Sequence, residues 1–224
     1  LNLFSLPFLM PDYAAMDALT GGEVGKDIFG ILSKAGVVPL AWGENGFREV
    51  TNSKRELRKP ADFKGLKFRV VGSPLFLDTF TALGANPTQM SWADAQPALA
   101  SGAVDGQENP FSVINASRYF EVQKYVSNTG HFFDFINVVA NKKAFDGLPA
   151  AQQKMVRDAM RKAVLWQRDR SRTEENEAIA EIRKKGMQYD EVSPAFREQL
   201  RKGSAGIVED VKKRVGADLV NRVQ

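Results

Sequence analysis

The chain has 224 residues, of which 43% are hydrophobic and 26% charged, as in a globular protein of one large domain or two small ones. Its 31 Lys and Arg residues are interspersed with 27 Asp and Glu residues, so we expect no nucleic-acid partner. The lack of cysteine excludes disulfides, thiolate nucleophiles and zinc ribbons, and the single histidine, His131, excludes multi-histidine metal sites.

The first part of the chain predicts an extended segment, an interrupted helix and a strand. Residues 3–11 are apolar but contain two prolines, which favours buried extended chain over helix. Asp12 suits the N-cap of a following helix, which Gly21 and Gly22 break into two pieces. Residues 37–42 form a short apolar run, which predicts a buried strand, and Pro39 favours a position at the sheet edge.

The middle of the chain alternates strand and helix. In chain order we expect a strand at 66–71, a helix started by Ser73 and Pro74, a short helix at 92–100, a tight polar turn at 104–110, a helix started by Pro110, and one or two strands within 122–141. Such alternation predicts an α/β fold.

A long helix follows. No residue between Pro149 and Lys185 breaks a helix, so about 35 residues at ~1.5 Å each predict a rod about 50 Å long. Apolar stripes lie near its two ends, whereas residues 167–177 include no large apolar side chain. We therefore expect this helix to pack at both ends, to be solvated in between and to span two lobes. Ser193 and Pro194 start a further helix.

Three motifs with a superficial likeness to functional sites have simpler interpretations. Residues 21–27 resemble a phosphate-binding loop, but the spacing is one residue short and Asp27 replaces the required Ser or Thr. The basic stretch at 154–172 leads directly into acidic residues, as is typical of a solvated helix face. His131 and Asp134 could form a carboxylate–imidazole pair, but without a second histidine or a G-x-S-x-G motif we favour a structural histidine.

Arg69 is the most informative position. It lies inside a predicted strand, where burying a guanidinium is costly unless an anion or a carboxylate pairs with it. A bound anion and a structural salt bridge both satisfy this requirement. Asn109 in its polar turn and Trp92 at a helix start are compatible with plain turn chemistry and core packing, respectively.

Several segments share a distinctive pattern in one order along the chain. They are 66–74 (LKFRVVGSP), 83–88 (LGANPT), 98–110 (ALASGAVDGQENP) and 119–125 (YFEVQKY). Together with residues 6–9 and the long helix, they resemble the substrate-binding proteins of tripartite ATP-independent periplasmic (TRAP) transporters. The DGQENP turn, at this distance from a strand arginine, is a specific part of the match.

The resemblance implies a periplasmic-binding-protein-like fold with two α/β lobes, hinge strands and one long helix that spans both lobes. Lobe I would comprise residues 1–45 and 132–174, and lobe II residues 46–131 and 175–224. Family members carry further strands and helices before the segment at 6–9, so we expect lobe I to be incomplete here. The apolar faces of residues 1–42 and 132–165 would then be partly uncovered. A removed signal peptide and a periplasmic location are also implied.

The resemblance also implies a binding site. The signature arginine falls on Arg69, which would grip a ligand carboxylate bidentately, and a second arginine falls on Arg48. The turn contributes Asn109 with its neighbour Glu108, and Trp92 provides an aromatic wall. We expect no cofactor and no metal, because the turn that carries Asn109 differs from that of metal-assisted members.

The implied function is to capture a small organic acid and deliver it to a membrane permease. The acid would be a sugar acid, a dicarboxylate or an aromatic acid. A ligand-sensing module of a signalling protein is the alternative, since the same fold serves sensors. We do not expect an enzyme, because His131 with Asp134 or Glu108 lacks a nucleophile or cofactor motif.

Overall fold

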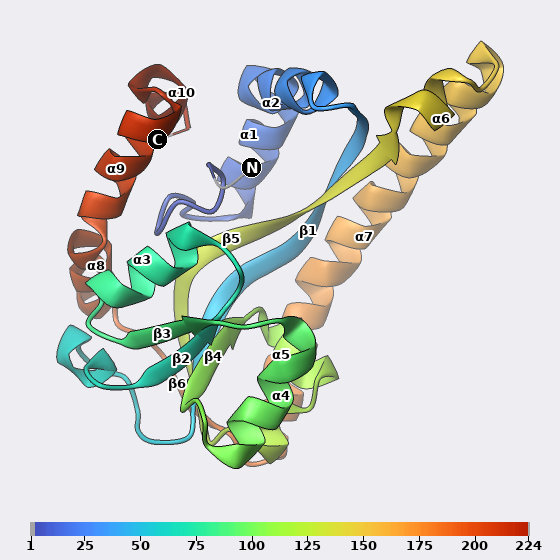
Figure 1. The fold of residues 1–224 in the computed structure, drawn as a ribbon. Helices are drawn as coiled ribbons and strands as arrows, with labels where there is room; N and C mark the ends of the chain where they lie inside the picture. The colour runs from blue at the N-terminus through green and yellow to red at the C-terminus, as the bar shows by residue number, and fades with distance from the viewer. Residues whose placement is uncertain (1–2, 224) are drawn as a thin grey trace.

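Figure 1 shows the fold in a computed structural model that describes residues 3–223; residues 1, 2 and 224, including the predicted start of lobe I, lie outside the described residues. The strands are β1 (Val37–Asn52), β2 (Lys67–Val70), β3 (Asn86–Gln89), β4 (Gly106–Asn109), β5 (Tyr125–Asn141) and β6 (Gln188–Asp190). The helices are α1 (Tyr13–Gly21), α2 (Glu23–Lys34), α3 (Pro74–Ala82), α4 (Trp92–Ser101), α5 (Phe111–Ala116), α6 (Lys142–Asp146), α7 (Ala150–Lys184), α8 (Pro194–Gly203), α9 (Ala205–Val215) and α10 (Ala217–Asn221), with 3-10 turns η1 (Pro60–Phe63) and η2 (Tyr119–Glu121).

The long strands β1 and β5 form the axis of the sheet. They pair antiparallel, from Val37 opposite Asn141 to Asn52 opposite Tyr125. The described strands follow the order β3-β2-β4-β1-β5-β6, in which β3, β2 and β4 run parallel to one another. In Figure 1, β1 and β5 rise from the lower part of the molecule, where the short strands gather, toward α2 and α6 in the upper part. This matches the predicted α/β fold with crossing strands.

Helices cover both faces of the lower sheet. Because successive strand residues point to opposite faces, Phe68 and Val70 enter a core with Phe80 of α3. Arg69, between them, points to the other face, where α4 lies. That face has its own apolar cluster, formed by α4, α5 and the C-terminal part of α7, with Leu99 and Ile182 among its members. The alternation therefore places a guanidinium beside α4 while its neighbours anchor the strand.

Several local predictions are confirmed. α1 ends at Gly21 and α2 begins at Glu23, so the two glycines do interrupt the helix, and the Asp12 side chain caps α1 by accepting from Ala15 N at 2.8 Å. α4 includes Pro97, as expected, and α7 spans 35 residues. No helix within residues 3–223 combines the length and the apolar composition needed to cross a bilayer.

The prediction of a polar turn at 104–110 is wrong, because β4 occupies residues 106–109 in the middle of the sheet. All of its residues are buried although three are polar. The side chains of Gln107 and Glu108 form hydrogen bonds to Thr51 and Arg48 of the neighbouring strand β1. A strand of this kind carries no apolar pattern that sequence inspection could detect. The short strands β3 and β6 were not predicted either.

The strand predicted at 37–42 is longer than expected, and only its later part lies inside the sheet. β1 continues to Asn52 and lies between β4 and β5. The edge position predicted for residues 37–42 is confirmed, because among the described residues this part of β1 pairs with β5 alone. β4 pairs only with residues Glu49–Asn52, so Pro39 lies where β5 is the paired neighbour and where the ladder shifts register. A proline is tolerated at such a position because no second ladder needs its missing N–H.

The predicted packing of the long helix is also corrected. Ala178 and Ile182 near its C-terminal end are buried, but Met155, Leu165 and Trp166 of the first half are exposed. The middle, expected to be solvated, instead contacts β1 through polar groups: the Gln167 amide accepts from Glu44 N at 2.9 Å and donates to Glu44 O at 2.7 Å. Ile31, Ile136 and Val139 are exposed as well. The apolar faces expected to be uncovered are thus exposed in the described structure.

Candidate functional site

Most of the predicted site residues lie at the carboxyl ends of the parallel strands. Arg69 is the penultimate residue of β2, Asn109 ends β4, and Trp92 follows β3 as the first residue of α4. Because β2, β3 and β4 are parallel, these three ends meet at one edge of the sheet. Ligands of open α/β sheets bind at this kind of edge.

Arg69 is buried without a carboxylate partner. Only 3% of the residue is exposed, and its Nε and Nη2 donate to the carbonyl oxygen of Met90 at 3.1 and 2.9 Å. Its Nη1 has no hydrogen-bond partner among the described residues. Burial lowers the pKa of the Arg69 guanidinium, with Glu108 acting in the opposite direction. The sequence leaves open whether Arg69 pairs with a bound anion or with a carboxylate of the protein. No such carboxylate contacts Arg69 among the described residues, so a bound anion is the alternative that remains.

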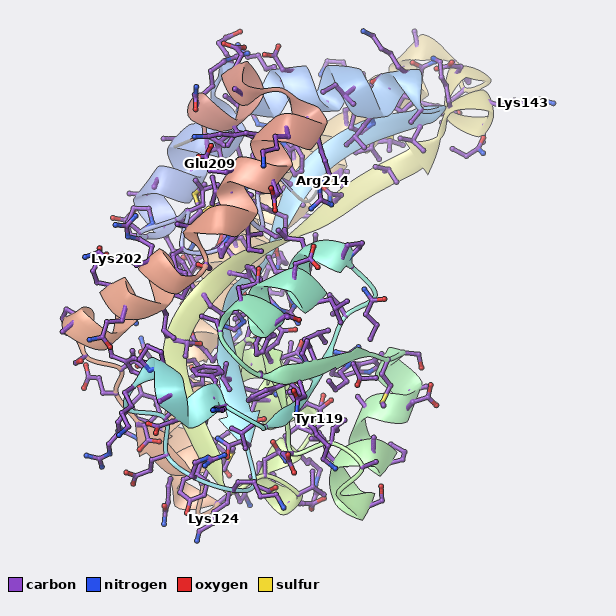
Figure 2. All side chains as sticks on the ribbon, turned by 60° about the vertical axis from the view of Figure 1, so that its left-hand side comes forward. Tyr119, Lys124, Lys143, Lys202, Glu209 and Arg214 are labelled. Atoms are coloured by element: carbon purple, nitrogen blue, oxygen red, sulfur yellow. The ribbon has the colours of Figure 1, made fainter. Side chains whose placement is uncertain are left out.

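Trp92 is half exposed. Its residue exposure of 50% is unusual for an indole at the start of a helix, and core packing therefore does not account for it. The ring lies 5.8 Å from the Arg69 guanidinium carbon and 6.0 Å from the ring of Tyr119. Figure 2 shows Tyr119 among the side chains of the lower part of the molecule, whereas Lys143 lies at the far end of the upper part. Arg69 and Trp92 thus provide a cationic group beside an exposed aromatic ring.

Arg48, unlike Arg69, is paired with carboxylates of the protein. Its Nε and Nη2 donate to the two carboxylate oxygens of Glu108 at 2.5 and 2.8 Å, and its Nη1 donates to Asp134 Oδ2 at 2.6 Å. The Nη2 group also donates to Asn109 Oδ1 at 3.1 Å. The residue is 2% exposed, and its guanidinium carbon lies 5.4 Å from the Phe76 ring. Two carboxylates therefore hold one guanidinium in a fixed orientation.

Glu108 is fully buried and contacts both Arg48 and His131. Burial would raise the pKa of the Glu108 carboxyl, but Arg48 and His131 outweigh this effect and hold that pKa below its ordinary value. His131 Nε2 lies 3.3 Å from Glu108 Oε2, and its Nδ1 lies 2.8 Å from Thr129 Oγ1. Burial lowers the pKa of His131. The imidazole therefore pairs with Glu108 rather than with Asp134.

A chain of buried side-chain hydrogen bonds orients Asn109. Its Nδ2 donates to Gln107 Oε1 at 2.5 Å, Gln107 Nε2 donates to Thr51 Oγ1 at 2.9 Å, and that hydroxyl donates to Gln123 Oε1 at 2.9 Å. Since Asn109 Oδ1 accepts from Arg48, the amide can point only one way. Its second N–H has no partner among the described residues, and so it is available to an acceptor.

Asp134 and Asn137 of β5 are polar site residues that the sequence did not single out as ligand contacts. They line a cavity of about 270 Å³ together with Phe4, Ser5, Arg48, Val71, Ser73, Phe76 and Phe135. Asn137 Oδ1 is buried with no partner among the described residues. Asp134 had been considered only as a partner for His131. An acidic residue within the aromatic run Phe132, Phe133, Asp134, Phe135 was the available signal.

A larger cavity, of about 540 Å³, lies elsewhere, and Arg69 lines neither of the two cavities. Its lining contains Glu49, Phe111, Glu175, Tyr189 and Arg197. Glu49 is buried and accepts a hydrogen bond from Gly130 N at 2.8 Å. Burial raises the pKa of the Glu49 carboxyl to about 8. Nothing in residues 3–223 brings three or more histidine or carboxylate side chains together as a metal-binding group.

Comparison with known proteins shows the family. The bacterial extracellular solute-binding proteins of family 7 match residues 1–214. This chain belongs to that family. A solute-binding protein of Verminephrobacter eiseniae is 38% identical over 83% of this chain and 56% of its own length. The 2,3-diketo-L-gulonate-binding periplasmic protein YiaO of Escherichia coli is 37% identical over all of this chain and 68% of its own length.

Solved structures of the family show the same fold. A TRAP periplasmic solute-binding protein from Ralstonia eutropha H16, with bound (S)-2-acetolactate, is 53% identical and superposes with a TM-score of 0.96 over 99% of this chain and 72% of its own. The predicted resemblance and the two-lobed fold class are therefore confirmed. These relatives are binding proteins rather than enzymes. The chain spans little more than half the length of the V. eiseniae relative.

Proposed function

We propose that this protein is the periplasmic solute-binding subunit of a TRAP transporter, and that it captures a small organic acid through Arg69 and delivers it to the membrane permease. The observation that carries the proposal is the state of Arg69, which is 3% exposed and has an Nη1 group without a partner among the described residues. A buried, unpaired cation is costly, and a ligand carboxylate would remove that cost.

The neighbours of Arg69 suit a carboxylate with a short carbon skeleton. A charge-assisted contact contributes roughly 1.5–3 kcal/mol and fixes the orientation of the carboxylate. The free N–H of Asn109 supplies a second donor at the same sheet edge. Trp92 presents an exposed ring beside the guanidinium, where it can cover the carbon atoms of the acid.

Arg48 and Glu108 have a different part in this site. Their mutual contacts leave Glu108 with no exposed surface, so we assign it to orienting Arg48 rather than to touching the ligand. Arg48 lines the cavity of about 270 Å³ together with Asp134 and therefore faces the ligand with at most one of its N–H groups. We regard it as a polar wall of the site.

The ligands of relatives support the choice of an organic acid. The R. eutropha protein binds 2-acetolactate, and the E. coli relative is named for 2,3-diketo-L-gulonate. Each is a small acid with oxygen-bearing carbons. The division into lobe I (1–45 and 132–174) and lobe II (46–131 and 175–224) belongs to the same proposal, with closure of the lobes about β1 and β5. Nothing in these comparisons favours a sensor module.

Calorimetric titration of the protein with a panel of small carboxylic acids tests this function. The panel should contain hydroxy acids, dicarboxylates and aromatic acids, each paired with its neutral amide. We expect at least one acid to bind while its amide does not, and to be recovered chemically unaltered after incubation. Binding of amides and acids with equal affinity, or conversion of the acid, would overturn the proposal.

A further inference from the structure

We propose that the site selects hydroxylated monocarboxylic acids, with the carboxylate at Arg69 and the hydroxyl groups directed at Asp134 and Asn137, and that it discriminates against dicarboxylic acids. This inference rests on the proposed function of Arg69. It assigns to two residues of β5 a role in specificity.

The first argument is that Arg48 has almost no remaining capacity to bind a second carboxylate. A guanidinium carries five N–H bonds. The Nε–H and both N–H bonds of Nη2 are directed at Glu108 and Asn109, and one N–H of Nη1 is directed at Asp134. A single N–H remains. It cannot form the bidentate fork with which an arginine recognises a carboxylate.

The second argument is the sign of the charge around Arg48. The carboxylates of Glu108 and Asp134 both contact this one guanidinium, so the group as a whole carries an excess of negative charge. The Asp134 side chain is 28% exposed and lines the cavity, whereas Glu108 is buried. A second ligand carboxylate entering the cavity would meet Asp134 at short range and be repelled, since like charges in a partly desolvated site are only weakly screened.

The third argument is that two oxygen atoms on the cavity wall have no hydrogen-bond donor among the described residues. Asp134 Oδ2 accepts from Arg48 and from Asn45 Nδ2 at 2.9 Å, but Oδ1 has no hydrogen-bond donor among the described residues. Asn137 Oδ1, on the same cavity wall, is also without a donor among them. A hydroxyl group can donate to such oxygens, whereas an ionised carboxylate can only accept. Both oxygens therefore favour a ligand with hydroxyl groups.

The remaining walls set the size and shape of the ligand. Phe4, Phe76 and Phe135 line the cavity, and their rings suit the C–H faces of a short carbon chain. The cavity volume of about 270 Å³ lies just below the range of pockets that bind drug-sized ligands, so the cavity suits a smaller molecule. Arg69 does not itself line this cavity, but Asn109, at the same end of the sheet as Arg69, contacts Arg48, which lines the cavity beside Asp134. We therefore infer that an acid held at Arg69 extends its carbon chain past Asn109 toward Asp134.

Three acids with four carbons test the inference on the unmodified protein: butanoate, 2,3-dihydroxybutanoate and butanedioate. Calorimetric titration should rank the dihydroxy acid first, at least about tenfold tighter than butanoate, since a hydrogen bond to a charged group contributes that much. Butanedioate should bind more weakly than the dihydroxy acid by a similar factor or more. Equal or tighter binding of butanedioate would overturn the inference. Failure of all three acids to bind, when another acid of the wider panel does bind, would also overturn the inference, whereas failure of the whole panel would count against the proposed function.

The substitution Asp134→Asn separates charge from shape in the same series. It retains an oxygen that can accept from Arg48 and Asn45 but removes the negative charge. We expect the preference for dihydroxybutanoate over butanedioate to shrink at least about tenfold. Asp146→Asn is the matched control, because Asp146 is exposed on α6 and pairs only with Lys142. An unchanged preference in a folded Asp134→Asn protein would remove Asp134 from the site.

Discussion

The two buried arginines of the lower sheet differ in one respect, which is whether the protein itself neutralises them. Arg48 is held by Glu108 and Asp134, whereas the carbonyl oxygen of Met90 is the only acceptor that the described residues offer Arg69. Their exposures, 2% and 3%, are nearly the same. Burial alone therefore does not distinguish a structural arginine from a ligand-binding one.

The partners of each arginine make the distinction. A guanidinium whose N–H groups are already used by carboxylates stabilises the fold and has little to offer a ligand. A guanidinium that is buried, unpaired and next to an exposed aromatic ring is arranged for an anion from outside. The account thus predicts that damage near Arg48 appears mainly in stability, and damage near Arg69 mainly in affinity.

The largest effect is expected from Glu108→Ala. This change removes the contact between Glu108 and His131, and it leaves Arg48 buried with Asp134 as the one carboxylate partner within residues 3–223. Breaking a buried pair in this way typically costs about 3–5 kcal/mol. Urea unfolding monitored by circular dichroism measures it. A loss below about 1 kcal/mol would show that the Arg48 cluster does not hold the hinge strands together.

Glu49→Gln tests a second kind of buried charge. Unlike the carboxylates around Arg48, the buried carboxyl of Glu49 has no ion-pair partner among the described residues. Burial raises the pKa of Glu49 to about 8, from an ordinary value of 4.5, with Glu175 and Arg197 acting in opposite directions. Between these values the native state holds a proton that the unfolded chain has released. The free energy of unfolding should therefore fall as the pH rises from about 5 to 8, by up to about 1.4 kcal/mol per pH unit.

The Glu49→Gln protein should lack this part of the pH dependence, since glutamine keeps an oxygen for Gly130 N but does not titrate. Unfolding curves of both proteins in urea at pH 5, 6, 7 and 8 provide the measurement. Their difference, rather than either curve alone, isolates the contribution of Glu49. Parallel curves across this range would contradict the raised pKa.

Arg69→Lys tests the other side of the comparison. Lysine keeps the positive charge but loses the planar fork, so the affinity for an organic acid should fall by about 10–100-fold. Stability should change by less than about 1 kcal/mol, because Arg69 contributes hydrogen bonds to a single carbonyl group. Titration and urea unfolding of the same preparation measure both quantities. Unchanged affinity in a folded variant would exclude Arg69 from the site.

Trp92→Ala should have the smallest effect on stability. Because the residue is half exposed, its loss should cost no more than about 1 kcal/mol of stability. The affinity should nonetheless fall several-fold, because the ring covers the space beside the Arg69 guanidinium. Trp166→Ala is a useful control, since Trp166 is 69% exposed on α7 and far from these residues in the sequence. Equal affinity losses in the two variants would argue against a ligand contact at Trp92.

Periodicity and caps were sufficient to predict most helices. The break at Gly21 and Gly22, the start of α3 after Ser73 and the 35-residue length of α7 all depend on local backbone preferences. The sequence also places Arg69 inside a strand between two apolar residues, Phe68 and Val70, although its position beside α4 is known only from the structure.

The remaining features depend on contacts between distant residues. β4 is polar, and only its hydrogen bonds to Thr51 and Arg48 make it a buried strand. The exposed first half of α7 and its polar contacts to Glu44 could not be read from its stripes. In the same way, Asp134 joins Arg48 from another strand, 86 positions away, without any local motif.

A crystal structure of the protein with a bound hydroxy acid would test the central claim most directly. The account predicts one carboxylate oxygen within about 3.2 Å of Nη1 of Arg69, at the end of β2, with Arg48 still paired to Glu108. An acid whose carboxylate lies away from Arg69, whether at Arg48 or in the cavity beside Glu49, would contradict it.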